Sequence, residues 1–296
     1  MKAKRIVSIL LTGSMLLSLL PVSALAAAPV FDAPAQTTAK KAAPLVQEAD
    51  ASRSTEEEAA TRSSRNLDAE NGTADSITIQ LNAEGKPESE GGSGHWKCDD
   101  ATNFNLLLYD GTFTLQPSSE PGAESALQTD LDIREDAEFN GGTVGWGTNN
   151  NGTISGGTFQ GGVYNSGTIS GGTFQGNKGG NVDNYANISG GTFHGKVYNY
   201  GNISNGTFQE NVGNYKTISN GTFQGEVYNF RGTISNGTFQ GILHNDSGTI
   251  SGGTFEEAVE VDAASGAEAK IEGGTFEKGM TLMNDDASIT ISDGLF

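Results

Sequence analysis

The sequence predicts an all-β fold, a parallel β-solenoid (β-helix) with about 15–16 residues per turn. Three observations lead to this prediction: a repeated phrase, an alternation of residue types with period two, and a composition that opposes helices. The phrase I-S-[GN]-G-T-F recurs with spacings of 15, 19, 15, 15, 16 and 16 residues. It begins at Ile154, Ile169, Ile188, Ile203, Ile218, Ile234 and Ile250. Repeated units of this kind are typical of solenoids, in which each unit buries its apolar side chains against its neighbours.

Each unit has the pattern of short strands joined at glycine corners. From Phe159 to Ile169 every second residue is apolar, Gly or Asn, which is the period of a strand. The phase changes at Gly156-Gly157, and glycines favour a corner there because they tolerate positive φ. Dense glycine and β-branched residues oppose helix formation. Units stacked ~4.8 Å apart would align their Ile, Phe and Val side chains into columns that share one core. Glycines at the inward positions beside these side chains are expected to leave room in a narrow bore.

Two features of the repeat need an interpretation of their own. Asn-Gly at 205–206, 220–221 and 236–237 is also a hairpin signal, so a meander of hairpins is the competing architecture. The arms of such hairpins, IS and TFQ, are too short to make a stable sheet, and this favours the solenoid. The 19-residue unit has four extra residues near 177–180 (NKGG), which we expect to form a surface loop.

The N-terminal quarter of the chain lacks the repeat. A basic start (MKAKR) precedes an apolar run and the small-residue pattern ALA at 24–26, which together indicate a secretory signal peptide. The next residues are rich in Ala, Pro, Ser, Thr and Glu, with few large apolar side chains to offset the entropy of ordering. We expect a signal peptide at 1–26, a disordered linker at 27–74, an N-terminal cap or first strands at 75–107, and the solenoid at 108–296. The predicted location is secreted or extracellular, including association with the cell surface.

Charge and motifs exclude several function classes. The formal net charge is −19, so no basic face is expected for nucleic acid. No further stretch is long enough for a transmembrane anchor. The repeats lack the aspartate pattern of calcium-binding solenoids and any phosphate-binding loop, so no metal and no cofactor are predicted. The single cysteine rules out an internal disulfide.

Two kinds of column are the candidate ladder and the candidate binding surface. An inward asparagine at a bend can bond the backbone of its own turn and of the next, and this predicts a structural ladder. The ladder consists of Asn165, Asn184, Asn199, Asn214, Asn229 and Asn245. Aromatic residues flank it, and by alternation we expect them to point outward, where they could bind sugar rings or another protein. The candidate binding residues are Tyr185, Tyr200, Tyr215 and Phe230 after the asparagines, and Tyr164, Tyr198 and Tyr228 before them.

Candidates for catalysis are sparse. His194 and His244 replace other residues in their columns and have no partner at ligand spacing in the sequence. His95 and Cys98 lie in the stretch HWKC, and a His–Cys pair could form a nucleophile. The stretch supplies no third group to orient the histidine, so no catalytic residue is predicted.

The phrase GTISGGTFQGxVYN resembles the repeats of secreted bacterial surface and adhesin-type proteins, whose fold is the right-handed parallel β-helix, pectin-lyase-like in the broad sense. The resemblance covers about residues 108–296. It implies a β-helical rod that is displayed outside the cell. Enzymes of that broad group, such as pectate lyases, carry clustered acids with Arg or Lys on one face, and the repeats here have no such cluster.

The favoured function is therefore an exported, non-enzymatic repeat scaffold for adhesion, with glycans or surface proteins as partners. The outward aromatic and polar columns would make the contacts. The alternative is a polysaccharide lyase or glycoside hydrolase of the β-helix type, which needs two or three acids converging in one groove beside a basic residue. A further expectation is end-to-end self-association through the uncapped C-terminal turn.

Overall fold

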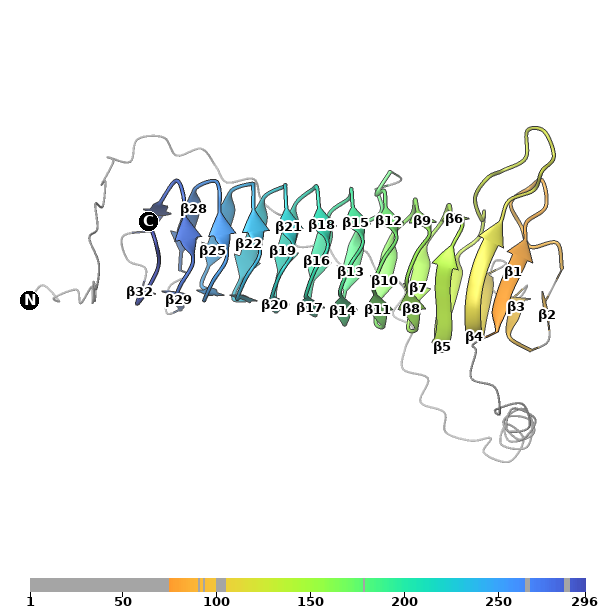
Figure 1. Cartoon of the computed structure of the whole chain (residues 1–296), viewed down its shortest axis with the longest axis horizontal. Coiled ribbons are helices and arrows are strands. Elements are labelled where there is room, and N and C mark those ends of the chain that lie inside the picture. The colour runs from red at the N-terminus through yellow and green to blue at the C-terminus, as the bar shows by residue number, and fades with distance from the viewer. Residues whose placement is uncertain are drawn as a thin grey trace, which may run out of the picture. The chain divides into compact units, whose positions relative to one another are not determined.

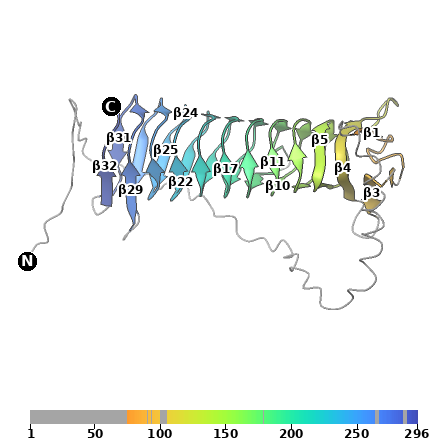
Figure 2. The same cartoon turned by 60° about the horizontal axis from the view of Figure 1, so that its bottom comes forward.

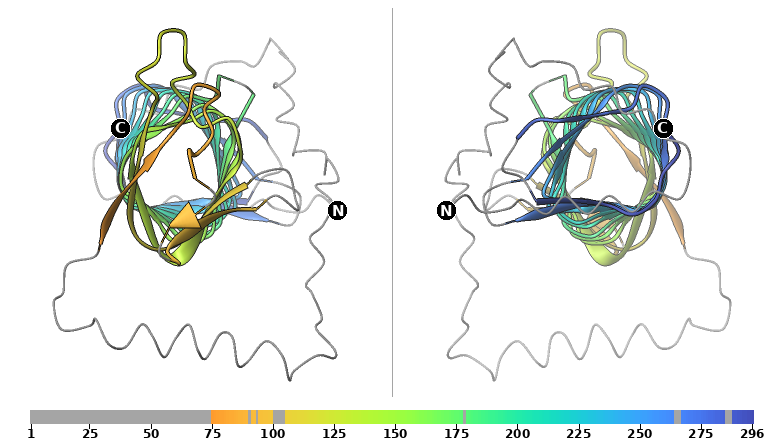
Figure 3. Two further views of the ribbon diagram at one scale, coloured as in Figure 1. Left: turned by 90° about the vertical axis from the view of Figure 1, so that its right-hand side faces the viewer. Right: turned by 90° about the vertical axis from the view of Figure 1, so that its left-hand side faces the viewer.

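The computed structural model describes residues 75–296, except for residues 90, 93, 100–104, 178, 264–266 and 285–287. The predicted signal peptide and linker lie outside the described residues. Every regular element in the described part is a strand, and the strands wind into a solenoid of about ten turns (Figure 1). The predicted fold class is confirmed. Seen end-on, successive turns superimpose on one another around a common axis (Figure 3).

Each repeat contributes three short strands. The Thr-Ile strands are β8 (Thr153–Ile154), β11 (Thr168–Ile169), β14 (Asn187–Ile188), β17 (Asn202–Ile203), β20 (Thr217–Ile218), β23 (Thr233–Ile234), β26 (Thr249–Ile250), β29 (Glu268–Ile271) and β32 (Ser288–Ile291). The Thr-Phe strands are β6 (Thr143–Val144), β9 (Thr158–Phe159), β12 (Thr173–Phe174), β15 (Thr192–Phe193), β18 (Thr207–Phe208), β21 (Thr222–Phe223), β24 (Thr238–Phe239), β27 (Thr254–Phe255) and β30 (Thr275–Phe276). The Val-x-Asn strands are β7 (Thr148–Asn150), β10 (Val163–Asn165), β13 (Val182–Asn184), β16 (Val197–Asn199), β19 (Val212–Asn214), β22 (Val227–Phe230), β25 (Leu243–Asp246), β28 (Val259–Asp262) and β31 (Met280–Leu282).

All of these strands pair in parallel with the same strand of the turns before and after, in register. The Thr-Phe strands form one sheet of nine strands, and the other two series belong to a second sheet. Figure 2 shows the same stacked strands from a second direction. A meander of hairpins requires antiparallel neighbours, so the parallel pairing rules it out for the repeats.

The first strands are longer and partly differ in direction. β4 (Asn105–Gln116) and β5 (Leu131–Gly141) pair in parallel with each other, and β5 continues into the repeats through β7 and β8. β1 (Ser76–Gln80) pairs in parallel with β4. β2 (Gly91–Gly92) and β3 (Trp96–Asp99) run antiparallel, with β3 between β2 and β4.

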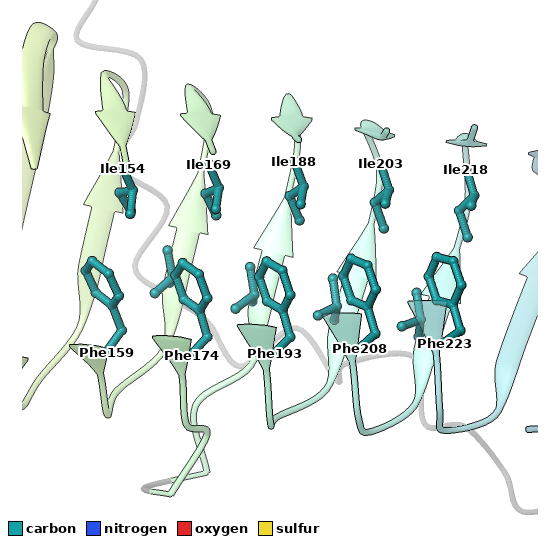
Figure 4. Packing of buried hydrophobic residues seen from close by; sticks show 14 of the residues in the cluster. Ile154, Phe159, Ile169, Phe174, Ile188, Phe193, Ile203, Phe208, Ile218 and Phe223 are labelled. Carbon is teal, nitrogen blue, oxygen red and sulfur yellow. The ribbon is translucent and has the colours of Figure 1, made fainter. Parts of the chain in front are cut away.

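The core consists of the predicted columns. The isoleucines and phenylalanines of successive turns stack in line, as Figure 4 shows, and their side chains are buried. The rings of Phe193 and Phe208 lie 4.7 Å apart at 4°, and the same stacking continues along the column. Face-to-face neighbours at this spacing follow from the distance between strands, so the sheet geometry itself sets the ring contacts.

Glycines turn the corners, as predicted, but they also serve a second purpose. Gly172 has φ +96°, and the equivalent second glycine of each repeat also lies in the left-handed region. The expectation that other glycines make room in the bore holds at Gly232, where a Cβ would lie 2.3 Å from the buried Asn214 Nδ2, but it is corrected at Gly167. A Cβ at Gly167 would lie 2.1 Å from the carbonyl oxygen of Gly152, so this glycine is required by the close approach of the stacked backbone.

The unequal unit lengths are absorbed at two places. Each 16-residue unit has one extra residue after the Val-x-Asn strand, Arg231 in one turn and Ser247 in the next, and both adopt positive φ (61° and 58°). The extra residues of the 19-residue unit leave the stack as a loop above β12 (Figure 1), which confirms the predicted surface loop. Register in the columns is therefore preserved despite the variation in length.

Candidate binding surface: an aromatic band beside a polar hollow

The asparagine ladder fixes the strand that carries the aromatic residues. All six predicted asparagines are fully buried. The Nδ2 of each one donates a hydrogen bond to the Oδ1 of the asparagine in the next turn, for example Asn184 to Asn199 at 2.7 Å, until the ladder ends at Asn245. Asn199 Nδ2 also donates to the carbonyl of Gly201 in its own turn and of Thr217 in the next, both at 3.0 Å. These bonds join the asparagine side chains of successive turns to one another and to the backbone. A seventh member, Asn150, was missed in the run Asn149–Asn151, although it lies 15 residues before Asn165.

The ladder forces its flanking residues to the outside, where seven rings form one continuous stack. We call it the aromatic band. Its neighbouring ring centroids lie 4.5–6.1 Å apart. In order along the solenoid, the band consists of Tyr164, Tyr185, Tyr200, Tyr215, Phe230, Tyr228 and His244. Six of the seven predicted aromatic residues therefore belong to one structure, which mixes the two sets expected from the sequence. His244 was missed as a member because a histidine was read as a chance replacement in the column.

Exposure differs sharply within the predicted set. Tyr164 and Tyr185 are 46% and 45% exposed, whereas Tyr198 and Tyr228 are each 6% exposed. The expectation that both sets are available at the surface is corrected for these two residues. Tyr228 packs on His244 and donates its hydroxyl to Glu226 Oε2 at 2.6 Å. The phenol of Tyr198 lies within interaction range of those of Tyr200 and Tyr215. Tyr228 is therefore a buried member of the band, and Tyr198 is buried beside it.

The stacking also changes what the band can offer a ligand. Tyr200 lies between Tyr185 and Tyr215, with centroid distances of 5.0 and 4.7 Å and interplanar angles of 16°. Both of its faces are occupied, so interior rings present edges and hydroxyl groups rather than flat faces. Tyr164 is different, because among the described residues its ring stacks on Tyr185 alone. The face of Tyr164 that points away from Tyr185 has no ring against it in the described part of the chain, and we call it the free face.

Burial among neighbouring phenols changes the acidity of the band. Desolvation, followed by the charges of the Tyr215 and Tyr185 phenolates, raises the pKa of Tyr200 to about 12. Desolvation also raises the pKa of Tyr185 and of Tyr215 above their ordinary value. The phenols are therefore neutral across the physiological range, and each can both donate and accept a hydrogen bond.

A hollow of about 360 Å³ lies beside the free end of the band. The register explains it. Gly147 and Gly162 occupy successive turns of one outward column, so two neighbouring turns carry no side chain there. Asp130 precedes them in the column and Asn181 follows them. The remaining walls are Asn149, Tyr164 and Asp183 on one side and Gly179-Gly180 of the inserted loop on the other. Sequence reasoning missed this site, since its signal is the absence of side chains.

The hollow is acidic. Asp130 accepts a hydrogen bond from the backbone N–H of Gly147 at 2.9 Å. Desolvation raises the pKa of Asp183 above that of an ordinary aspartate, because the carboxyl is partly buried on its strand. None of the described residues that line the hollow is basic. The walls therefore offer carboxylates, amides and one aromatic face, which together suit a ligand that donates hydrogen bonds.

His95, Cys98 and His244 do not line the hollow, although His244 belongs to the band. His95 pairs with Asp110, and its Nε2 lies 4.0 Å from Asp75 Oδ2. Cys98 Sγ lies 3.8 Å from the carbonyl oxygen of Ser89. His244 Nδ1 pairs with Glu260 at 2.9 Å, at the far end of the band. Within the described ranges, no group of three His, Cys, Asp or Glu side chains could hold a metal ion.

Comparisons with known proteins give no assignment. No protein-family model, no curated protein and no solved structure matches the chain. No helix in the described part is long and apolar enough to cross a membrane.

Proposed function

We propose that the chain is an exported, non-enzymatic repeat scaffold that binds glycans at a cell or polymer surface through its aromatic band. The observation that carries the proposal is the band itself, a row of stacked rings that follows one edge of a rigid solenoid across six turns. Export is supported by the signal-peptide pattern at 1–26, and surface display by the resemblance of the repeats to adhesin-type β-helices.

The physical basis is repetition of weak contacts. Interior rings offer their polarised C–H edges and neutral hydroxyl groups, which suit the alternating C–H and O–H groups of a sugar chain. A single such contact is weak. Rings held ~4.8 Å apart on a rigid support can contact one extended polymer at several points, and linked contacts bind far more tightly than any one of them. The interior of the band would then act as an extended, shallow contact strip.

The test is retention on insoluble polysaccharides. The full chain is compared with Tyr200→Ala plus Tyr215→Ala, which removes two half-buried rings from the middle of the band. We expect clear loss of retention on any polysaccharide that binds the unchanged chain. Gln224→Ala plus Gln240→Ala is the matched control, since both glutamines are exposed and lie outside the band. Retention that is the same for all three proteins would refute the role of the band.

A lyase or hydrolase of the β-helix type is the second candidate, because Asp130 and Asp183 line one hollow and the pKa of Asp183 is raised. Two features weigh against it. The strands of the two aspartates lie three turns apart, ~14 Å at ~4.8 Å per turn, and no described lining residue is basic. Incubation with neutral and acidic polysaccharides would decide: new chain ends that vanish with Asp183→Asn would establish catalysis.

A further inference from the structure

We infer that the hollow at Gly147 and Gly162 is a single binding subsite for one neutral hexose unit of a glycan, with the sugar ring stacked on the free face of Tyr164. The inference rests on the proposed function, since it names the ligand class and the place where one unit is held. The two proposals predict different stoichiometries, because the band offers many equivalent contacts, whereas two consecutive glycines occur once in the described part of this outward column.

The free face of Tyr164 is the first argument. Every interior ring of the band has a neighbour on both sides, whereas in the described part of the chain Tyr164 has one ring neighbour, Tyr185, at 4.6 Å with the ring planes tilted by 31°. Its side chain also lines the hollow. A flat apolar surface at the edge of a hollow is the element that orients a sugar ring, because the axial C–H groups of a hexose lie on one face of it. A bound ring would extend the stack by one member.

The floor of the hollow is the backbone of two neighbouring turns, at Gly147 and Gly162, and its length fits one sugar ring. The outward column that contains the hollow reads Asp130, Gly147, Gly162, Asn181, Lys196, Asn211, Glu226 and Ile242 in successive turns. Among these eight positions, two glycines follow one another only at the hollow. Two bare turns give a floor ~10 Å long at ~4.8 Å per turn, which suits one sugar ring rather than an extended chain. The volume of about 360 Å³ lies at the small end of ligand pockets.

The walls of the hollow are polar and suit a neutral sugar. Asp183 and Asp130 present carboxyl groups, and Asn149 and Asn181 present amides, to the same space. Carboxylates accept hydrogen bonds from sugar hydroxyls, and amides can both donate and accept. A uronate or sialic acid would bring its own negative charge between two aspartates, in a chain with net charge −19. The walls therefore favour neutral sugars and disfavour acidic ones.

The experiment is isothermal titration calorimetry of the full chain with neutral hexaoses of glucose, galactose and mannose, and with a hexamer of galacturonate. We expect at least one neutral hexaose to bind with a stoichiometry of one per chain, and the galacturonate not to bind. Tyr164→Ala removes the aromatic face on which the sugar ring stacks and is expected to weaken binding about tenfold. Gly162→Ile fills the floor and is expected to abolish binding.

Gly162→Ile is a fair test because the site can hold a side chain. The nearest atoms to a Cβ there are the carbonyl oxygen of Asn181 at 3.5 Å, Gly180 Cα at 3.6 Å and the backbone nitrogen of Asn181 at 3.9 Å, which are ordinary contacts. Isoleucine already occurs in the same column at Ile242. Asn211→Ile is the matched control, as it makes a similar change three turns away, and binding should be unaffected.

The outcomes separate this inference from the function on which it rests. Binding that survives Gly162→Ile but is lost with Tyr200→Ala plus Tyr215→Ala, or that has a stoichiometry well above one, overturns the subsite and leaves the glycan-binding scaffold standing. Galacturonate that binds as tightly as the neutral hexaoses overturns the ligand class. Failure of every hexaose to bind, together with no retention on polysaccharides, overturns both.

Discussion

Asn199 lies in the middle of the asparagine ladder, and its replacement by Val tests why the ladder is polar. Its Oδ1 accepts from Asn184 at 2.7 Å, and its Nδ2 donates to Asn214 at 2.8 Å. An apolar side chain fits the column, since Ile133 and Val261 occupy the same position in other turns. The substitution therefore removes hydrogen bonds without introducing a steric conflict.

The magnitude follows from which atoms lose their partner. Asn184 Nδ2 keeps the carbonyls of Ala186 and Asn202, both at 3.3 Å, so this donor stays satisfied. Asn214 Oδ1 has Asn199 as its donor and lies in a fully buried side chain, so it is left unpaired. A buried unpaired acceptor costs about 1–3 kcal/mol, and the hydrogen bonds lost with the side chain, offset by the burial of an apolar valine, add about 1 kcal/mol net. We expect Asn199→Val to lower the free energy of unfolding by about 2–4 kcal/mol.

Asn150→Val is the matched control. Asn150 Oδ1 already lacks a partner, because the preceding residue in the column is Ile133. Replacing Asn150 removes this unpaired oxygen and leaves that of Asn165 unpaired instead, so the number of buried unpaired acceptors does not change. Only the lost hydrogen bonds contribute, and the expected decrease is about 1 kcal/mol.

The assay is equilibrium urea unfolding followed by circular dichroism, with midpoints compared at equal slope. The expected order of stability is unchanged chain, Asn150→Val, Asn199→Val. Equal losses in the two variants would contradict the argument, since they would mean that the unpaired oxygen of Asn214 carries no penalty. A wild-type midpoint for Asn199→Val would contradict it more strongly.

Three further predictions concern the corner, the loop and the band. Gly172→Ala places a Cβ on a residue with φ +96° and should lower the free energy of unfolding by about 1–2 kcal/mol, measured by the same urea assay. Deletion of residues 177–180 shortens a surface loop outside the stack, so the free energy of unfolding from the urea assay should change by less than about 0.5 kcal/mol. A decrease of several kcal/mol would show that the loop stabilises the turn. The pKa of Tyr200, raised to about 12, means that above pH 10 the unfolded chain loses a proton that the folded chain keeps. Stability should therefore be full below about pH 10 and fall between pH 10 and 12, and Tyr200→Phe should reduce that fall.

The columns could be predicted from the sequence because a solenoid turns sequence period directly into spatial register. Ile169 lies on Ile188 and Phe174 on Phe193 despite a 19-residue spacing, since the extra residues leave the stack at a corner. The buried asparagines followed from the same rule, because no other inward polar residue recurs in every unit.

The site could be predicted only in part, because side chains from different columns meet in space. Tyr164 lies before its asparagine, yet its ring stacks on Tyr185, which lies after the asparagine of the next turn. Tyr228 and Phe230 come from one strand and join the same band. The sequence period describes each column separately. It does not say in which direction a long side chain extends from its own column toward a neighbouring one. The hollow could not be predicted from the sequence, because it forms where Gly147 and Gly162 lack side chains, and glycines are frequent throughout the repeats.

The left-handed residues Arg231 and Ser247 have a consequence for how such a chain can vary over evolutionary time. Each is the one extra residue of its turn and lies at a corner, so a turn tolerates a one-residue insertion without a change of register in its neighbours. A duplication or loss of a whole turn is then a small structural event, because the new turn meets the same Ile, Phe and Asn contacts above and below. The length of the rod is thus free to drift by copying errors, whereas the bare floor formed by Gly147 and Gly162 is kept only when both of those turns are kept side by side.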